Sequence, residues 1–141
     1  MIPRGQRNNN PGNLDYNPKN KWVGQRGIET GVPNPRFAVF DSPENGIRAL
    51  VRLLLNYILR YKLTTVEQII KRYAPSNENF TDAYVTGVQK DSGIGTNKID
   101  PANVEQMFAL VVAIIKHELG TQPYHTSVIR EGLRRAGLNT K

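Results

Sequence analysis

The chain contains no cysteine and only two histidines. Without thiols there is no disulfide framework, no thiolate zinc site and no thiol nucleophile. His117 and His125 are separated by a spacing that fits no familiar metal motif, so we expect no metal site and no other cofactor. Carboxylates are therefore the main remaining candidates for catalysis.

Long hydrophobic runs are also missing. No stretch of about 18 apolar residues occurs, so we expect no transmembrane helix and no membrane insertion. The polar N-terminus predicts no secretory signal peptide. A length of 141 residues is that of one ordinary domain. We expect this single domain to consist of a loop and hairpin lobe over 1–41 and a helical part over 42–141.

Basic residues outnumber acidic ones, 19 to 12, which gives a net charge of +7. An excess of positive charge favours an anionic partner, such as an anionic cell-wall polymer, a membrane surface or nucleic acid, although a solvated surface explains it equally well. The basic residues form no dense tract, and no known nucleic-acid motif appears. A nucleic-acid partner is therefore the third choice and is not expected.

Residues 1–41 are rich in Asn, Pro and Gly, which is typical of loops and turns. Short strands are predicted at Trp22–Gly24 and Arg36–Phe40, with a turn between them that makes a loose hairpin. The asparagines at Asn8–Asn10 are explained adequately by turn formation.

Helical signals dominate the rest of the chain. Ser42 is a good N-cap for a helix that ends near Tyr61. Thr64 and Glu67 predict a capping box for a short helix that ends near Tyr73, before Pro75. Further helices are expected over Thr81–Gln89, from Asp100 to near Gly120, and over Val128–Ala136. The predicted fold class is mainly α with a small β part (α+β).

Glu118 interrupts an apolar helix face. The residues of this face recur at spacings of three and four, and Glu118 lies three residues beyond its last member, Ile115. Gly120 follows at the expected C-cap, which places Glu118 at the negative end of the helix dipole. Burial and dipole both disfavour the ionised carboxylate, as a general acid requires. The alternative is a structural one, in which Glu118 pairs with an arginine.

Glu29 is the second carboxylate to consider. It falls inside the predicted hairpin, where a carboxylate is usually solvated. Amide and aromatic side chains are abundant in the loops around it. Amides pair with hydroxyl and acetamido groups and aromatic rings stack on sugar faces, so this composition suits a sugar polymer.

Several blocks of the sequence resemble small bacteriophage and prophage virion proteins. The resemblance covers nearly the whole chain, and the combined spacing of the blocks is moderately specific. The blocks are Arg7–Leu14, Trp22–Gly24, Arg36–Ala49, Ala74–Tyr84 and His117–Tyr124.

A second resemblance concerns Val112–Gly120. This segment is similar to the catalytic helix end of lysozyme-like lytic transglycosylases and glucosaminidases, where an apolar helix ends in Glu, usually followed by Ser, with Gly close behind. Leu119 stands where Ser is common. In those enzymes the catalytic helix precedes the hairpin, whereas here it follows. The resemblance thus implies a lysozyme-like domain that is circularly permuted.

That resemblance implies a peptidoglycan lytic transglycosylase or muramidase, which cleaves the β-1,4 bond between N-acetylmuramic acid (MurNAc) and N-acetylglucosamine (GlcNAc). Glu118 would protonate the glycosidic oxygen and then act as a base, while Glu29 would stabilise the oxocarbenium-like state or activate water. The end of the Glu118 helix must then face the Asn13 loop and the Glu29 hairpin across one cleft. The expected substrate contacts are Asn13, Trp22, Tyr84 and Tyr124.

The alternative is a virion structural or cell-wall-binding protein without catalysis. In either case the expected partners are peptidoglycan and other virion proteins. The expected location is the virion, or the host cytoplasm before release, with action in the periplasm and cell wall.

Overall fold

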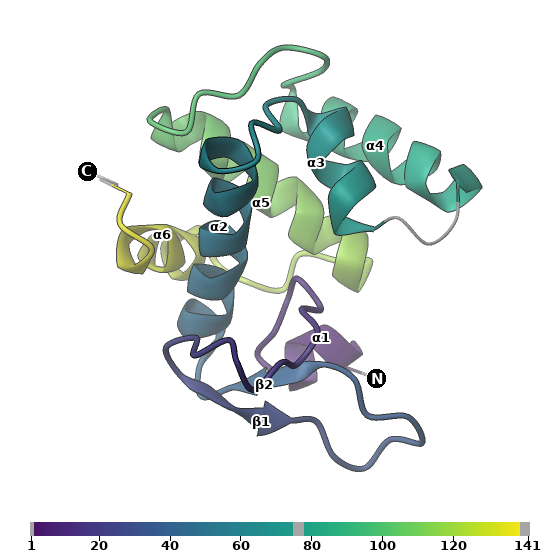
Figure 1. Cartoon of the computed structure of the whole chain (residues 1–141), viewed down its shortest axis with the longest axis vertical. Helices are drawn as coiled ribbons and strands as arrows, with labels where there is room; N and C mark the ends of the chain where they lie inside the picture. Colours follow the sequence, from purple (N-terminus) through teal and green to yellow (C-terminus); the bar gives the residue numbers. More distant parts are fainter. Residues whose placement is uncertain (1, 75–77, 139–141) are drawn as a thin grey trace.

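The computed structural model describes residues 2–74 and 78–138. Helices dominate, and a two-stranded antiparallel sheet accompanies them, which confirms the predicted α+β class (Figure 1). In chain order the elements are α1 (Arg4–Arg7), β1 (Gln25–Ile28), β2 (Ala38–Phe40), α2 (Pro43–Leu59), α3 (Val66–Tyr73), α4 (Glu78–Ser92), α5 (Val104–Leu119) and α6 (Thr126–Arg135).

Helix α5 lies at the centre of the helical part (Figure 1). It packs against α4 and α6, and its C-terminal end contacts α1 of the N-terminal lobe. Leu110 and Ile114, which lie outside the stripe that the sequence predicts, are fully buried, so the apolar surface of α5 is wider than that stripe.

Buried asparagines hold the N-terminal lobe together. Asn10 is fully buried, and its Nδ2 donates to the carbonyl oxygens of Leu14 and Ala38, both at 2.9 Å. Its Oδ1 accepts from the Leu14 backbone N–H at 2.9 Å. The Phe40 N–H donates to the Asn8 carbonyl at 2.9 Å. These residues tie the loop to β2, a function beyond the turn formation that the sequence indicates.

The first strand begins three residues later than predicted. The segment Trp22–Gly24 is a turn, because the Gln25 N–H donates to the Trp22 carbonyl at 3.0 Å and Gly24 has a φ of 80°. Strand β2 falls within the predicted 36–40. It pairs antiparallel with β1, with Ile28 opposite Ala38.

The capping box of α3 also lies one residue later than predicted. It uses Thr65 and Gln68 in place of Thr64 and Glu67. The Thr65 side chain accepts from the Gln68 N–H at 3.2 Å, and the Gln68 Oε1 accepts from the Thr65 N–H at 3.2 Å. The helix ends at Tyr73, where the sequence predicts its end, and Pro75 lies outside the described residues.

Other helix ends differ modestly from the prediction. Ser42 caps α2 as expected. Asn103, rather than Asp100, caps α5, because the Asp100 carboxylate accepts from the Ala102 N–H in a preceding turn. Helix α4 extends beyond its predicted range at both ends, and His125 caps α6.

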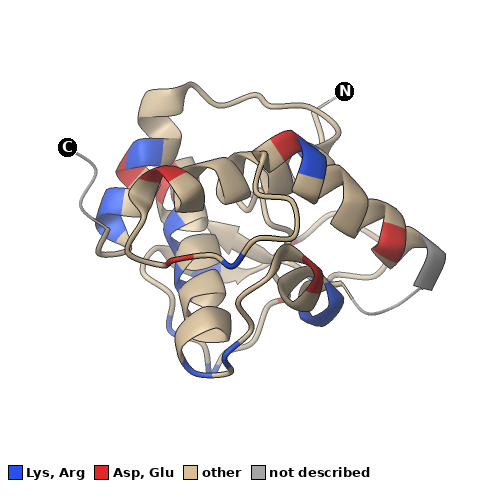
Figure 2. Cartoon of the chain, turned by 90° about the horizontal axis from the view of Figure 1, so that it is seen from above, with Lys and Arg blue, Asp and Glu red and all other residues tan. Residues whose placement is uncertain are grey.

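The charged residues are distributed broadly. Figure 2 shows Lys and Arg on several helices and loops rather than in one tract, as the sequence indicates. Among the helices that the structure describes, none has the length and hydropathy needed to cross a membrane.

A close approach between the lobe and α2 depends on Gly46. A Cβ placed there would lie 1.8 Å from the Asn9 carbonyl oxygen, far inside van der Waals contact. We expect Gly46→Ala to lower the free energy of unfolding by at least about 2 kcal/mol, because the Asn9 backbone must move. Urea unfolding followed by circular dichroism measures this loss.

Gly87→Ala in α4 is the matched control. A Cβ at Gly87 meets nothing within 4 Å. The control should stabilise the protein by about 0.5–1 kcal/mol through helix propensity. Equal stability of Gly46→Ala and the wild type would contradict the packing of the Asn9 loop on α2.

Candidate functional site

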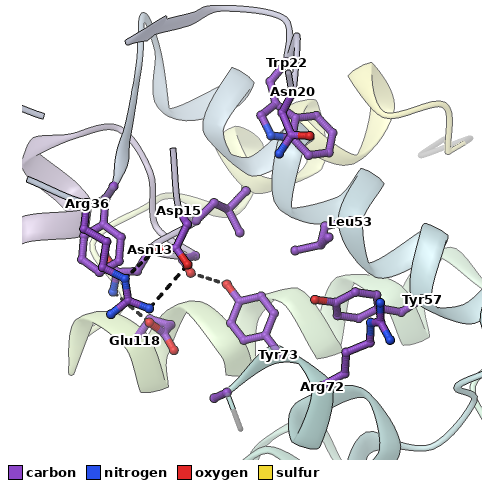
Figure 3. A pocket seen from close by; sticks show the side chains of 14 residues that line it. Asn13, Asp15, Asn20, Trp22, Arg36, Leu53, Tyr57, Arg72, Tyr73 and Glu118 are labelled. Carbon is purple, nitrogen blue, oxygen red and sulfur yellow. Dashed lines mark hydrogen bonds and ion pairs between the residues drawn. The ribbon is translucent and has the colours of Figure 1, made fainter. Parts of the chain in front are cut away.

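A polar cleft of about 570 Å³ opens between the N-terminal lobe, α2, α3 and the end of α5. Figure 3 shows Glu118, Asn13, Asp15 and Arg36 near one another, with Trp22 in another part of the cleft. The lining residues are Gly12, Asn13, Leu14, Asp15, Asn20, Trp22, Arg36, Phe37, Leu53, Tyr57, Arg72, Tyr73, Ala74 and Glu118.

Glu118 is half-buried at the C-terminal end of α5. The Asn13 Nδ2 donates to its Oε1 at 2.8 Å, across 105 residues of sequence. Gly120 ends the helix in the left-handed conformation, with a φ of 74°. The end of α5 therefore meets the Asn13 loop at the cleft, as the resemblance implies, whereas Glu29 of the hairpin does not line the cleft.

The lobe fixes the position of Asn13. Its own φ of 50° turns the chain, and its N–H donates to the Asn10 carbonyl at 2.9 Å. Its Oδ1 is buried and has no hydrogen-bond partner within the described residues. A Cβ at the neighbouring Gly5 would lie 2.7 Å from that Oδ1, so glycine is needed for α1 to pack here.

Two tyrosines, Tyr84 and Tyr73, lie near Glu118. Tyr84 is buried, stacks on His117 with ring centroids 3.6 Å apart, and meets Tyr73 edge-on at 6.4 Å. Burial, followed by the nearby Tyr73 and Glu118, raises the pKa of Tyr84 far above its usual range. Its hydroxyl thus stays neutral. The Tyr73 hydroxyl donates to the Gly12 carbonyl, and burial also raises its pKa.

Asp15 and Arg36 form an ion pair in the cleft. Arg36 Nε donates to Asp15 Oδ1 at 2.5 Å, and both side chains are well exposed. The hydrogen bond to Asp15 is the main cause that raises the pKa of Arg36. Asp15 reaches this place because it pairs with Phe37 in an isolated β-bridge. In the sequence, Asp15 is marked only by its position two residues after Asn13, so it was not among the expected site residues.

Glu29 is neither solvated nor placed in the cleft, so the expectations of a solvated or a catalytic carboxylate are both wrong. Its side chain is buried and accepts hydrogen bonds from Arg4 Nε at 2.8 Å, from a second Arg4 nitrogen and from Asn8 Nδ2 at 3.0 Å. The backbone N–H groups of Arg36 and Phe37 also donate to it, at 3.0 and 2.9 Å. The hydrogen bonds from Arg4 are the main cause that holds its pKa well below its usual value. Glu29 does not line the cleft, and with its oxygens occupied it serves as a structural anchor.

The expected substrate contacts divide into two groups. Asn13 and Trp22 line the cleft, whereas Tyr84 and Tyr124 do not. Tyr84 is buried near Glu118. Tyr124 is half-buried, and burial raises its pKa to about 12. The lining also includes Asn20, Tyr57 and Arg72, which no local pattern in the sequence marks.

The two histidines have structural roles. His117 stacks on Tyr84, and the His125 Nδ1 accepts from the Ser127 N–H at the start of α6. Over residues 2–74 and 78–138, no group of three or more His, Cys, Asp or Glu is placed to hold a metal ion. The chemical groups that the cleft presents are the half-buried Glu118 carboxyl and its polar neighbours.

The anchoring role of Glu29 generates a stability prediction. Glu29→Gln should lower the free energy of unfolding by about 2 kcal/mol or more at pH 7, because the amide cannot accept from all of these donors. A carboxyl whose folded-state pKa is depressed contributes stability above its unfolded pKa, near 4.5, and this is lost as the pH falls. The gap between wild type and variant should therefore narrow toward pH 3, measured by urea unfolding at both pH values.

Glu105→Gln is the control for this measurement. Glu105 makes a similar two-pronged pair with Arg130, but its side chain is 70% exposed. Its removal should change the stability little, since water screens the pair. A Glu29→Gln protein as stable as the control would contradict the anchoring role.

Comparison with known proteins places the chain among phage proteins. No family model matches it. Over 131 residues it is 37% identical to Protein P5 of Pseudoalteromonas phage PM2. The matched region spans 92% of this chain and 79% of that protein. This confirms the resemblance to phage proteins, while the relative's name states no activity. The chain belongs to the family of this phage protein, Protein P5.

Proposed function

We propose that the protein cleaves the glycan strands of peptidoglycan at the β-1,4 bond between MurNAc and GlcNAc, with Glu118 as general acid and base. The observation that carries this proposal is the Glu118 carboxyl, half-buried on a polar cleft and oriented by Asn13 at 2.8 Å. A positioned carboxyl on a cleft with sugar-binding side chains is the central requirement of glycoside cleavage.

The reaction begins with proton donation. Protonated Glu118 gives its proton to the glycosidic oxygen as the bond to the anomeric carbon breaks, and the GlcNAc side leaves with a new hydroxyl. In a lytic transglycosylase the Glu118 carboxylate then takes the proton of the muramic 6-hydroxyl, whose oxygen bonds to the anomeric carbon. The product is a 1,6-anhydro sugar, and Glu118 regains its proton.

Asn13 is suited to both protonation states of this cycle. Its Nδ2 donates to the carboxylate in the structure. The protonated carboxyl donates a hydrogen bond and needs an acceptor. A flip of the Asn13 side-chain amide supplies this acceptor, because its Oδ1 has no other partner within the described residues.

Other residues of the cleft support a sugar substrate. Trp22 offers an aromatic face for stacking, while Asn20 and Arg72 offer donors for hydroxyl and acetamido oxygens. The kinship with a phage protein agrees with this substrate, since a phage has to cross the bacterial wall.

The chain order of these elements supports a permuted lysozyme-like arrangement. The Asn13 loop and the hairpin precede α2, and the helix that carries Glu118 comes near the C-terminal end. In the enzymes that the sequence resembles, the catalytic helix comes first. We propose the same arrangement in space with a rotated chain order.

Asp15 is the candidate second carboxylate if water replaces the 6-hydroxyl. It shares the cleft with Glu118, whereas Glu29 does not. A hydrolase needs such a carboxylate as base or nucleophile, and a transglycosylase needs none.

Glu118→Gln should lower the release of soluble muropeptides from purified sacculi by about 100-fold or more, because the amide cannot donate a catalytic proton. Glu105→Gln, a change of the same kind at an exposed position on α5, is the control and should keep full activity. Mass spectrometry of the digests identifies the reaction, since anhydromuramyl ends indicate a transglycosylase and reducing muramic ends a hydrolase.

Full activity of a folded Glu118→Gln protein would exclude the proposed acid. Unchanged sacculi with wild-type protein would favour the alternative, a virion structural or wall-binding protein in which Glu118 only holds Asn13.

Asp15→Asn separates the two reaction types. With a transglycosylase we expect the rate to fall less than about tenfold, through loss of the Arg36 pair. With a hydrolase the loss should be about 100-fold or more, since water is no longer activated. Initial rates on sacculi, with circular dichroism to verify folding, provide the comparison.

A further inference from the structure

A second, open hollow of about 330 Å³ lies beside the cleft. Four of its lining side chains are cations and none is a carboxylate. The lining residues are Lys19, Asn20, Lys21, Trp22, Arg48 and Arg52. A hollow with one sign of charge attracts ligands of the opposite sign.

The hollow and the cleft are adjacent, because Asn20 and Trp22 line both of them. A polymer that extends from Glu118 along the cleft and past Trp22 would reach the cationic hollow.

Two of the cations are held in place by the end of α6. Arg48 Nε donates to the Arg135 carbonyl at 3.2 Å, and Arg52 donates to the Ala136 carbonyl at 3.1 Å. These bonds use neutral acceptors, and neither arginine forms an ion pair with another residue that the structure describes. Helix α6 thus orients the arginines without neutralising them.

The other two cations are exposed lysines. Within the described residues, neither Lys19 nor Lys21 makes an ion pair, so both charges are available to a ligand. Together with the arginines they give the hollow four positive charges for one ligand segment.

The adjoining cleft decides which anion fits. The cleft is lined by two carboxylates, Asp15 and Glu118, and by two cations, Arg36 and Arg72, so it offers no net positive charge to a nucleic acid, which carries a phosphate at every nucleotide. A strand with an uncharged backbone and carboxylates on its side groups matches both a cleft without net charge and a cationic hollow. Peptidoglycan has that pattern, since its sugars are neutral and its stem peptides carry carboxylates. Trp22, between the two hollows, offers a face on which a sugar ring can stack.

We propose that the hollow formed by Lys19, Lys21, Arg48 and Arg52 binds stem-peptide carboxylates on the glycan strand whose sugars occupy the cleft. This inference deepens the proposed function and rests on it for the identity of the polymer. It assigns the hollow to substrate recognition, separate from bond cleavage at Glu118.

The test measures binding without cleavage. Glu118→Gln protein is incubated with native sacculi, with sacculi whose carboxyl groups have been amidated chemically, and with duplex DNA, and the bound fraction is measured by sedimentation or retention. The test variant adds Lys19→Gln and Lys21→Gln. The control variant adds Lys90→Gln and Lys98→Gln, which remove two exposed charges from another part of the surface.

We expect the Lys19 and Lys21 changes to weaken binding to native sacculi roughly three- to tenfold at low salt, with a smaller difference at high salt. The control variant should bind like its parent. On amidated sacculi all three proteins should bind equally, because the anionic groups are gone.

Equal binding of test and control variants to native sacculi would overturn the inference, as would an equal loss on amidated sacculi. A loss confined to DNA would assign the hollow to nucleic acid and overturn it as well. Muropeptide release by the protein with an unchanged Glu118 is measured separately, so failure of this inference and failure of the proposed cleavage are distinguishable.

Discussion

The buried Glu29 carboxylate is the constraint on which the N-terminal lobe depends. Removing a carboxylate from water is costly unless donors surround it. Arg4 from α1 and Asn8 from the following loop provide side-chain donors, and backbone N–H groups just before β2 complete the set. One side chain thereby joins three segments of the lobe. With the backbone of Arg36 fixed in this way, its side chain extends to Asp15 in the cleft.

The two glutamates that the sequence singles out have opposite environments. Glu29 is enclosed by donors that favour its ionised form, so it is fixed and chemically silent. Glu118 accepts from Asn13 and keeps a face on the cleft. The same kind of side chain thus joins segments of the lobe in one place and faces a polar cleft in the other, because the number of surrounding donors differs.

The close contact between lobe and helices relies on small or polar groups. Gly5 and Gly46 admit backbone and amide atoms that any Cβ would obstruct. Asn10 is fully buried beside the hydrophobic residues Ala38 and Leu14, and its amide satisfies their buried backbone groups. Hydrogen bonds from buried amides thus stabilise the lobe together with its hydrophobic residues.

Local patterns of the sequence predict the helical class, the cap of α2 at Ser42 and the acid on the apolar face of α5, because helix periodicity and capping are local effects. A resemblance carried by short blocks also indicates that the end of α5 and the Asn13 loop share a site. The burial of Glu29 and the place of Asp15 in the cleft follow from long-range pairing. Both outcomes depend on which distant segments pair with residues 36 and 37, and no local pattern encodes that pairing.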